Sequence, residues 1–303
     1  MGFSKRQFYF WLLVLMCVPI VNASHGWGYQ RQNNWPGYCT QGKLQSPINI
    51  EVSQTVYDRS HLRGKLQFSG YENVDMDVVN NGHTVQWTVK SSPPKLSGGP
   101  LHEAYYLHNV HLHWTSEHKI NGAEYGMEIH LVHVKQGYTL ANAIGLSDGL
   151  SVIAVLCQVD DRIADQSALM QLMPIMNSVM SKTSQPIPAG TINVRKFMGH
   201  LPEYYYTYQG SLTTPDCNEA VIWIVMDQPI FITQAQYNHM IQPDVGGRFN
   251  FRFTQPVHRV VYRSYSNQRD INLENKAEMN LVSKVLFNAS VCISLCVYYL
   301  KIM

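Results

Sequence analysis

Short strand-like runs dominate the chain and predict β-strands; in some of them apolar and polar residues alternate, and others are continuously apolar. Successive side chains of a strand point to opposite faces, so this alternation is typical of strands with one buried face. Pro, Gly, Asn and Ser separate the runs. The runs cover residues 65–71, 76–89, 105–114, 126–134, 150–159, 204–211, 221–226 and 258–265. The pattern favours a mainly β chain with one large twisted sheet over a simple sandwich.

Helical periodicity is rare along the chain. The best candidate covers residues 166–181, although Pro174 interrupts it, and a shorter helix is expected to start near Thr233. No internal repeat or long linker divides the sequence, so we expect one domain at residues 24–267.

The N-terminus has the features of a secretory signal peptide. Lys5 and Arg6 precede an apolar run at 8–21, and small residues ending at Ala23 suit cleavage there. We therefore expect residues 1–23 to be a signal peptide. The alternative is a membrane anchor helix, for which the apolar run is short.

The C-terminus carries a second apolar segment, residues 285–303, with Lys301 as its single charged residue. This hydrophobic tail fits a GPI-attachment signal, with residues 268–284 as the linker or spacer, or a short membrane span. A soluble protein with an unusual tail is the remaining possibility. Together the two ends predict an extracellular protein, secreted or attached to the outer cell surface.

Composition narrows the function classes. The chain has 303 residues, of which 45% are hydrophobic, and this is enough for a substantial core. A net charge of +2 gives no reason to expect a nucleic-acid partner.

Outside the two terminal segments lie Cys39, Cys157 and Cys217. Cys157 falls in an apolar strand and is expected to be a buried free thiol, so Cys39 and Cys217 remain as a candidate disulfide.

Histidines gather on two of the predicted strands. Asn109, His111 and His113 share one strand face, and Glu128 and His130 share one face of the next strand. If the strands pair antiparallel, the three histidines converge, and three imidazoles with an open fourth position suit catalytic zinc. Asn109 and Glu128 are placed to hold His111 and His130. The spacing alone leaves a purely structural role open.

Residues 116–133, "SEHKINGAEYGMEIHLVH", resemble the signature of the α-class carbonic anhydrases. Further matches occur in the order typical of that family, at residues 26–29, 45–50, 80–87, 111–114, 210–217, 221–225 and 249–259. The resemblance implies a single domain around a large, mostly antiparallel twisted β-sheet with a few short surface helices. It also implies a zinc ion (Zn2+) in a conical cavity.

The resemblance also implies roles for individual residues. The zinc ligands would be His111, His113 and His130, with Thr213 held by a gatekeeping Glu117. His83 would be the proton shuttle. Cavity water would be ordered by Tyr29, Asn81 and Gln86, and Asn109 would support the first ligand. An apolar wall would be formed by Val132, Val152, Leu212, Val221 and Trp223, with Thr214 at the substrate edge. Cys39 and Cys217 match the disulfide of secreted and membrane-bound members.

The implied activity is reversible hydration of carbon dioxide to bicarbonate and a proton through zinc-bound hydroxide. Aromatic sulfonamides and anions are then expected inhibitors. Two alternatives are a catalytically inactive binding module and a zinc hydrolase acting on esters. The presence of all the implied ligands disfavours the first. We expect His118 and His133 to be structural hydrogen-bonding groups, and the short stretch at 114–116 to alter only the rim of the cavity.

Overall fold

The computed structural model describes residues 26–162, 167–183, 185–199 and 202–266. The predicted signal peptide, the spacer at 268–284 and the tail at 285–303 lie outside these described residues. Within them, no helix is both long enough and apolar enough to cross a membrane.

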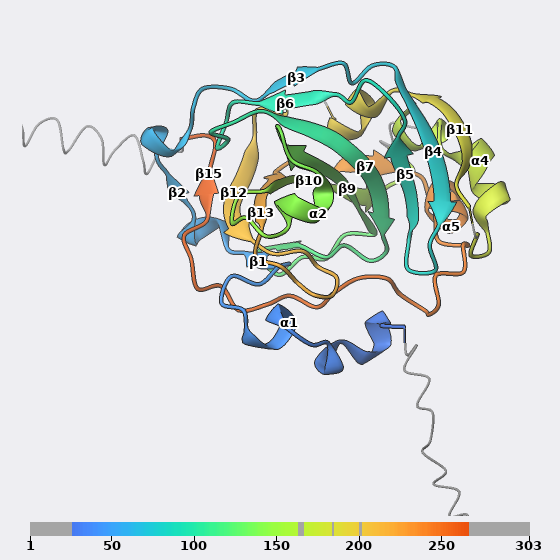
Figure 1. The fold of residues 1–303 in the computed structure, drawn as a ribbon, viewed down its shortest axis with the longest axis horizontal. Helices are drawn as coiled ribbons and strands as arrows, with labels where there is room; N and C mark the ends of the chain where they lie inside the picture. The colour runs from blue at the N-terminus through green and yellow to red at the C-terminus, as the bar shows by residue number, and fades with distance from the viewer. Residues whose placement is uncertain (1–25, 163–166, 184, 200–201, 267–303) are drawn as a thin grey trace, which may run out of the picture.

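A 13-stranded sheet forms the body of the molecule (Figure 1). Its strands are β2 Val56–Tyr57, β3 Gln67–Ser69, β4 Val74–Asn80, β5 Val85–Val89, β6 Lys95–Ser97, β7 Tyr105–His113, β9 Met127–Lys135, β10 Leu150–Val159, β11 Ile187–Ile192, β12 Tyr205–Gly210, β13 Val221–Met226, β14 Ile230–Ile232 and β15 Tyr262–Arg263. The main path runs β11-β4-β5-β7-β9-β10-β13-β12-β15-β2. Most neighbours are antiparallel, whereas β10 pairs parallel with β13 and β14, and β15 with β2. The predicted fold class is confirmed.

Two short strands, β1 Asn49–Ile50 and β8 Lys119–Ile120, form a separate parallel pair. Helices are few and short in the described residues. They are α1 Tyr38–Gln41, α2 Leu140–Ala143, α3 Ser167–Met170, α4 Met173–Met176 and α5 Gln234–Met240, with 3-10 turns η1 Tyr29–Asn34, η2 Val52–Gln54, η3 Arg59–His61, η4 Asn177–Val179 and η5 Val194–Met198.

The predicted helix at 166–181 is wrong as a continuous element. The segment is broken into α3, α4 and η4, and Pro174 lies in the first turn of α4. Proline lacks an N–H for the preceding turn, so it begins a new helix more readily than it continues one. The helix predicted near Thr233 is confirmed as α5. The Thr233 hydroxyl accepts the Gln236 N–H at 3.1 Å, and Gln236 accepts the Thr233 N–H at 2.8 Å.

Strand prediction failed where local chemistry departs from alternation. The run at 76–89 is a hairpin of β4 and β5, with Gly82 at φ +85° in the turn. Strand β11 was not predicted, because it contains Pro188 and Gly190, residues disfavoured in strands. Its pairing with β4 shifts register between those two residues.

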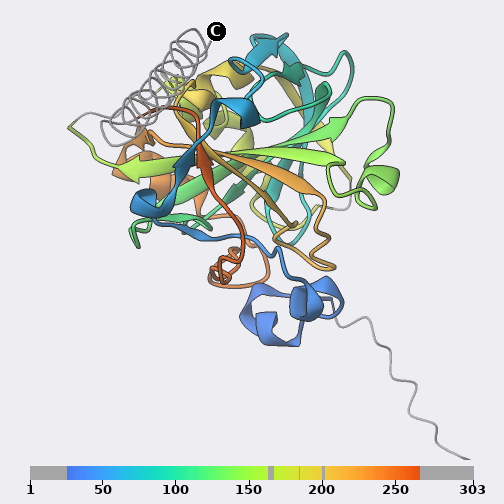
Figure 2. The ribbon, with the colours of Figure 1, turned by 90° about the vertical axis from the view of Figure 1, so that its left-hand side faces the viewer.

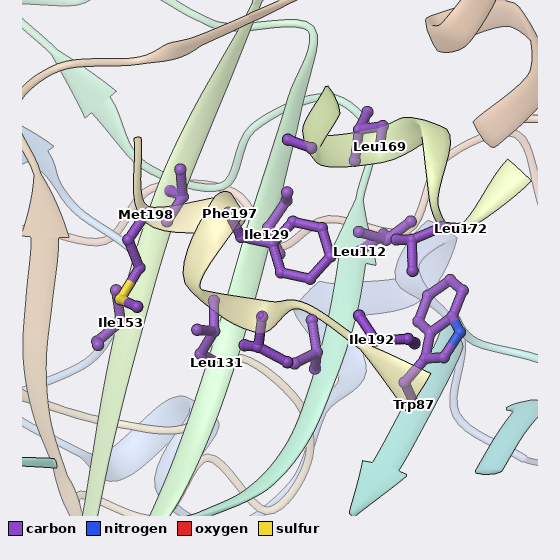
Figure 3. Packing of buried hydrophobic residues seen from close by; sticks show 14 of the residues in the cluster. Trp87, Leu112, Ile129, Leu131, Ile153, Leu169, Leu172, Ile192, Phe197 and Met198 are labelled. Atoms are coloured by element: carbon purple, nitrogen blue, oxygen red, sulfur yellow. The ribbon is translucent and has the colours of Figure 1, made fainter. Parts of the chain in front are cut away.

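Two apolar cores lie on opposite faces of the sheet. In the larger core, Leu112, Ile129 and Leu131 of the central strands pack beneath Leu169 and Phe197 (Figure 3). The smaller core holds Val132, Val152, Val221, Trp223 and Tyr208 among its members. The face that carries the smaller core also carries the candidate chemistry.

The N-terminal segment forms a separate layer beneath the sheet, next to a C-terminal loop (Figure 2). Gln32 joins the two, donating to the Phe251 carbonyl and accepting the Phe253 N–H, both at 2.9 Å. The predicted Cys39–Cys217 disulfide is confirmed and ties the same layer to the loop before β13. Cys157 is a buried free thiol, as expected.

Candidate metal centre

Strands β7 and β9 bring three histidines to one point. They pair antiparallel with His111 opposite His130 and His113 opposite Glu128. One ring nitrogen from each of His111, His113 and His130 lies within 4.8 Å of the others. This is the convergence that strand parity predicts.

Each of the three rings is held through one nitrogen by an oxygen acceptor. Nδ1 of His111 donates to Asn109 Oδ1 at 2.9 Å, and Nδ1 of His113 donates to the Asn250 carbonyl at 2.6 Å. His130 donates through Nε2 to Glu128 Oε1 at 2.6 Å. The second nitrogen of each ring is left for another partner, and Nε2 of His113 is buried without one among the described residues.

Burial keeps these imidazoles neutral. It lowers the pKa of all three, to about 3 for His113 and well below the ordinary value for His111. A neutral imidazole presents a lone pair, which is the form that binds a metal. Three such lone pairs with oriented rings fit the donor set of a catalytic zinc site.

Glu128 links the cluster to a second histidine. Burial alone raises the pKa of Glu128, but charges and hydrogen bonds from His118 and His130 outweigh it and lower the pKa. His118 donates to Glu128 through its backbone N–H and through Nδ1, both at 2.7 Å, and its Nε2 lies 2.6 Å from the Tyr208 hydroxyl. Both ring nitrogens of His118 are therefore occupied, and it is a hydrogen-bonding group, as expected.

Glu117 and Thr213, distant in sequence, meet beside the cluster. Glu117 is buried, and its Oε1 accepts the Arg252 N–H at 2.8 Å and lies 3.6 Å from His113 Nδ1. Burial and the charge of Glu128 raise the pKa of Glu117, and hydrogen bonds from Thr213 and Arg252 oppose that rise. The family resemblance implies that Thr213 donates to Glu117, whose Oε2 is buried without a hydrogen-bond partner among the described residues.

Apolar side chains form a wall beside the histidines. In the β-sheet register, Val152 stands between Val132 and Trp223. The ring of Trp223 lies 5.0 Å from that of His130, and its Nε1 donates to the Ser211 carbonyl at 3.1 Å. Val221 is buried in the same core, Leu212 packs against it, and Thr214 is half-buried. The implied wall residues are therefore brought together.

The sequence model of the eukaryotic-type carbonic anhydrases matches residues 25–265, nearly the whole described domain. The chain belongs to the carbonic anhydrase family. It is 33% identical to a putative carbonic anhydrase 5 of Caenorhabditis elegans, with 83% of this chain and 86% of that protein covered. It is 34% identical to human carbonic anhydrase 7 (71% and 85% covered) and 31% identical to rat carbonic anhydrase 4 (86% and 92% covered). The protein is thus a carbonic anhydrase enzyme.

His83 of this carbonic anhydrase lies in the β4–β5 turn and stacks on Trp27, with ring centroids 3.8 Å apart at 11°. Asn81 Oδ1 accepts the N–H groups of His83 and Thr84, both at 2.9 Å, and so shapes the turn. Burial, followed by the charge of Lys182, lowers the pKa of His83.

Two other carbonic anhydrase residues assigned to cavity water lie near the histidines. The ring of Tyr29 is 6.5 Å from that of His113, edge to face. Gln86 stands opposite His111 in the register, and its side-chain amide donates to Thr88 at 3.1 Å.

Two contacts of this carbonic anhydrase site were missed by sequence reasoning. Asn250 holds His113 through its carbonyl and also accepts the Trp114 N–H at 2.8 Å through Oδ1. Arg252 donates its backbone N–H to Glu117. Both belong to the matched motif at 249–259, but that irregular segment carries no periodicity that would aim them at the site.

Proposed function

We propose that this carbonic anhydrase catalyses the reversible hydration of carbon dioxide to bicarbonate and a proton, with zinc held by His111, His113 and His130. The observation that carries the proposal is a cluster of three neutral imidazoles, those of His113 and His130 buried and that of His111 partly buried, each with one ring nitrogen held by oxygen and the other left free. When bound, zinc acts as a Lewis acid that lowers the pKa of a water to about 7.

The residues behind the ligands fix ring orientation. Asn109 Oδ1, the Asn250 carbonyl and Glu128 Oε1 each accept one imidazole N–H. Each acceptor therefore selects the tautomer whose remaining nitrogen faces the common point. Glu128 is itself held by His118, so the support extends one residue further.

Thr213 and Glu117 would orient the reactants. A Thr213 hydroxyl that donates to Glu117 has only its lone pairs left to face the cavity. The hydroxyl oxygen can then accept a hydrogen bond from an O–H group of a reactant, and it cannot donate one to a reactant lone pair. Glu117 keeps its place because the Arg252 N–H holds its Oε1.

The apolar wall would receive carbon dioxide, which is small and nonpolar. Val132, Val152, Leu212, Val221 and Trp223 offer no hydrogen-bonding group toward it, since the Trp223 N–H is already used by Ser211. Water is held poorly against such a surface. Thr214, at the edge of the wall, would contact the polar bicarbonate as it forms.

His83 would export the proton to solvent. Its pKa lies below the usual 6.5, so the ring is neutral at pH 7 and can accept a proton. Tyr29, Asn81 and Gln86 would order the water between the histidine cluster and this turn.

The test is a hydration assay on the zinc-loaded protein, with and without an aromatic sulfonamide. We expect hydration of carbon dioxide that depends on zinc and is lost when the sulfonamide is added. Ester hydrolysis measured on the same sample should be weak by comparison. Full hydration by metal-free protein, or ester hydrolysis with no hydration, would contradict the proposal.

We also propose an extracytoplasmic location, with residues 1–23 removed, 24–267 as the catalytic domain and 285–303 as a GPI signal or a membrane anchor that brings the protein to the outer cell surface. The Cys39–Cys217 disulfide supports an oxidising compartment. Release from intact cells by a phosphatidylinositol-specific phospholipase is expected for a GPI anchor. Resistance to the enzyme would favour a membrane span.

A further inference from the structure

The two residues proposed to orient the reactants come from loops that are far apart in the sequence. Glu117 lies between β7 and β8, and Thr213 lies in the loop at 211–217, between β12 and β13. Both side chains are buried. Because neither residue lies on a strand, the register of the sheet does not by itself set the spacing between them.

Arg252 fixes the Glu117 side of this pair. Its backbone N–H donates to Glu117 Oε1 at 2.8 Å. The other carboxylate oxygen, Oε2, is buried without a hydrogen-bond partner among the described residues, so it remains available to the Thr213 hydroxyl. The position of that oxygen therefore depends on where the Arg252 backbone lies.

The guanidinium of Arg252 is tied to the C-terminal end of the loop at 211–217. Its Nη1 donates to Gln45 Oε1 at 2.9 Å, and Gln45 Nε2 donates in turn to the Cys217 carbonyl at 3.2 Å. Its Nη2 donates at 3.3 Å to the carbonyl of Cys39, the disulfide partner of Cys217. One side chain is thus connected to both halves of the disulfide.

The same guanidinium is tied to the N-terminal end of the loop through Ser46. Nη1 of Arg252 donates to the Ser46 carbonyl at 2.8 Å. The Ser46 N–H donates to the Ser211 hydroxyl at 2.9 Å, and the Ser211 N–H donates to the Ser46 hydroxyl at 3.0 Å. Both ends of the loop that carries Thr213 are therefore connected to one buried cation.

The Arg252 side chain is suited to hold a fixed spacing. The residue is 3% exposed, and its guanidinium lies over the ring of Trp35, 5.7 Å from the centroid. Burial lowers the pKa of Arg252 to about 10, so the group stays charged at neutral pH. A guanidinium presents its donors in a rigid planar fork, and hydrogen bonds from a charged donor are stronger than neutral ones.

We propose that Arg252 is a positioning residue for hydration. Its side chain holds the Thr213 loop at the spacing that brings the Thr213 hydroxyl to the Glu117 carboxylate, which the Arg252 N–H anchors. This role rests on the function proposed for Glu117 and Thr213, because Arg252 acts through them. A displacement of about 1 Å can cost about 100-fold in rate, so loosening the link should lower turnover without removing a metal ligand.

Arg252→Met removes every guanidinium donor and keeps an unbranched side chain. We expect kcat for carbon dioxide hydration to fall by about 10–100-fold, with KM changed by less than about threefold because the apolar wall is untouched. Zinc content by atomic absorption should stay at one per chain. Arg252→Lys keeps the charge but lacks the fork, so it should recover only part of the loss.

Arg263→Met is the matched control. Arg263 is also 3% exposed, lies on β15 and donates to the Thr55 hydroxyl at 2.7 Å. Its replacement removes a buried guanidinium at the edge of the sheet, so it should lower stability and leave kcat unchanged.

A double variant separates positioning from a general structural role. The hydroxyl is already missing in Thr213→Val, so adding Arg252→Met should lower kcat by less than about twofold further. If Arg252→Met does not fold, Gln45→Met cuts the link to Cys217 alone and should show the same pattern with a smaller loss.

Three results would overturn the proposal: full kcat in the folded, zinc-loaded Arg252→Met or Gln45→Met protein, loss of zinc from it, or an equal loss of kcat in the Thr213→Val background. Absence of hydration in the parent protein would contradict the proposed function on which this role rests.

Discussion

His130 and His133 lie three residues apart on β9, and both are buried, yet they have opposite surroundings. His133 fills both ring nitrogens: Nε2 lies 2.7 Å from the Tyr71 hydroxyl, and Nδ1 donates to the Ser151 carbonyl at 3.2 Å. His130 binds Glu128 through Nε2 and turns its other nitrogen toward His111 and His113.

The difference teaches how a candidate ligand is told from a structural histidine. Burial lowers the pKa of both rings, so burial does not separate them. The two rings differ in how many of their nitrogens already have a hydrogen-bond partner within the protein. A ring with two internal partners is complete, whereas a ring with one occupied nitrogen offers a lone pair to a metal.

The largest effect on zinc binding is expected for His113→Ala. We expect zinc affinity to fall by more than about 100-fold, because removing a ligand should cost more than the 10–100-fold typical of a supporting residue. Zinc content by atomic absorption, and hydration activity on the same sample, measure the effect. The exposed His258→Ala is the control. Retention of one zinc per chain and full activity in His113→Ala would remove His113 from the ligand set.

Glu128→Gln should weaken zinc binding by about 10–100-fold. Glu128 accepts N–H groups from both His118 and His130, and an amide supplies only one oxygen and introduces a competing donor. Zinc dissociation into a chelator measures the change. Glu124→Gln, at a 54% exposed side chain paired with Lys119, is the matched control. Equal dissociation rates in the two variants would show that ring support is not the role of Glu128.

His133→Leu should give the reverse outcome to His113→Ala. The Tyr71 hydroxyl and the Ser151 carbonyl lose a partner in a buried site, so unfolding should become easier by about 1–3 kcal/mol. Zinc content should stay at the parent level. Urea unfolding of the zinc-loaded protein gives the free energy. Loss of zinc in the folded variant would contradict the rule drawn from nitrogen occupancy.

The smallest effect concerns His83. The positive charge of Lys182 disfavours the imidazolium form, so Lys182→Gln should raise the pKa of His83. The pH at which His83 becomes available to accept a proton then moves upward. NMR titration of the imidazole measures the shift directly, with Lys90→Gln as control, at a lysine that follows β5 and pairs with Asp77. An unchanged or lowered pKa would show that Lys182 does not act on the ring.

Strand parity was enough to place His111, His113 and His130 together, because side-chain direction in a strand has a fixed period of two. Glu117 and Thr213 needed the ordered motifs, since neither lies on a strand and no local pattern aims one at the other. Asn250 and Arg252 were missed for the same reason. Their contacts depend on the path of an irregular segment, and this path is set by tertiary packing.

The fold shows the same limit. Strand β10 was predicted to the residue, because it is a continuous apolar run that is buried over its first eight residues. Strand β11 was missed because its stability comes from pairing with β4 and not from its own residues. Pro174 predicted an interruption of the helix, but the sequence did not predict that the segment would form several short helical turns.

The Cys39–Cys217 bond has a consequence for limited proteolysis of the domain. It closes a covalent ring of sequence separation 178. His83, all three candidate zinc ligands, Glu117 and Thr213 lie within that ring. A single cut in any surface loop between the two cysteines opens the ring but leaves both fragments joined. The nicked protein would run as one band until a reducing agent divides it, and its metal centre would keep every residue.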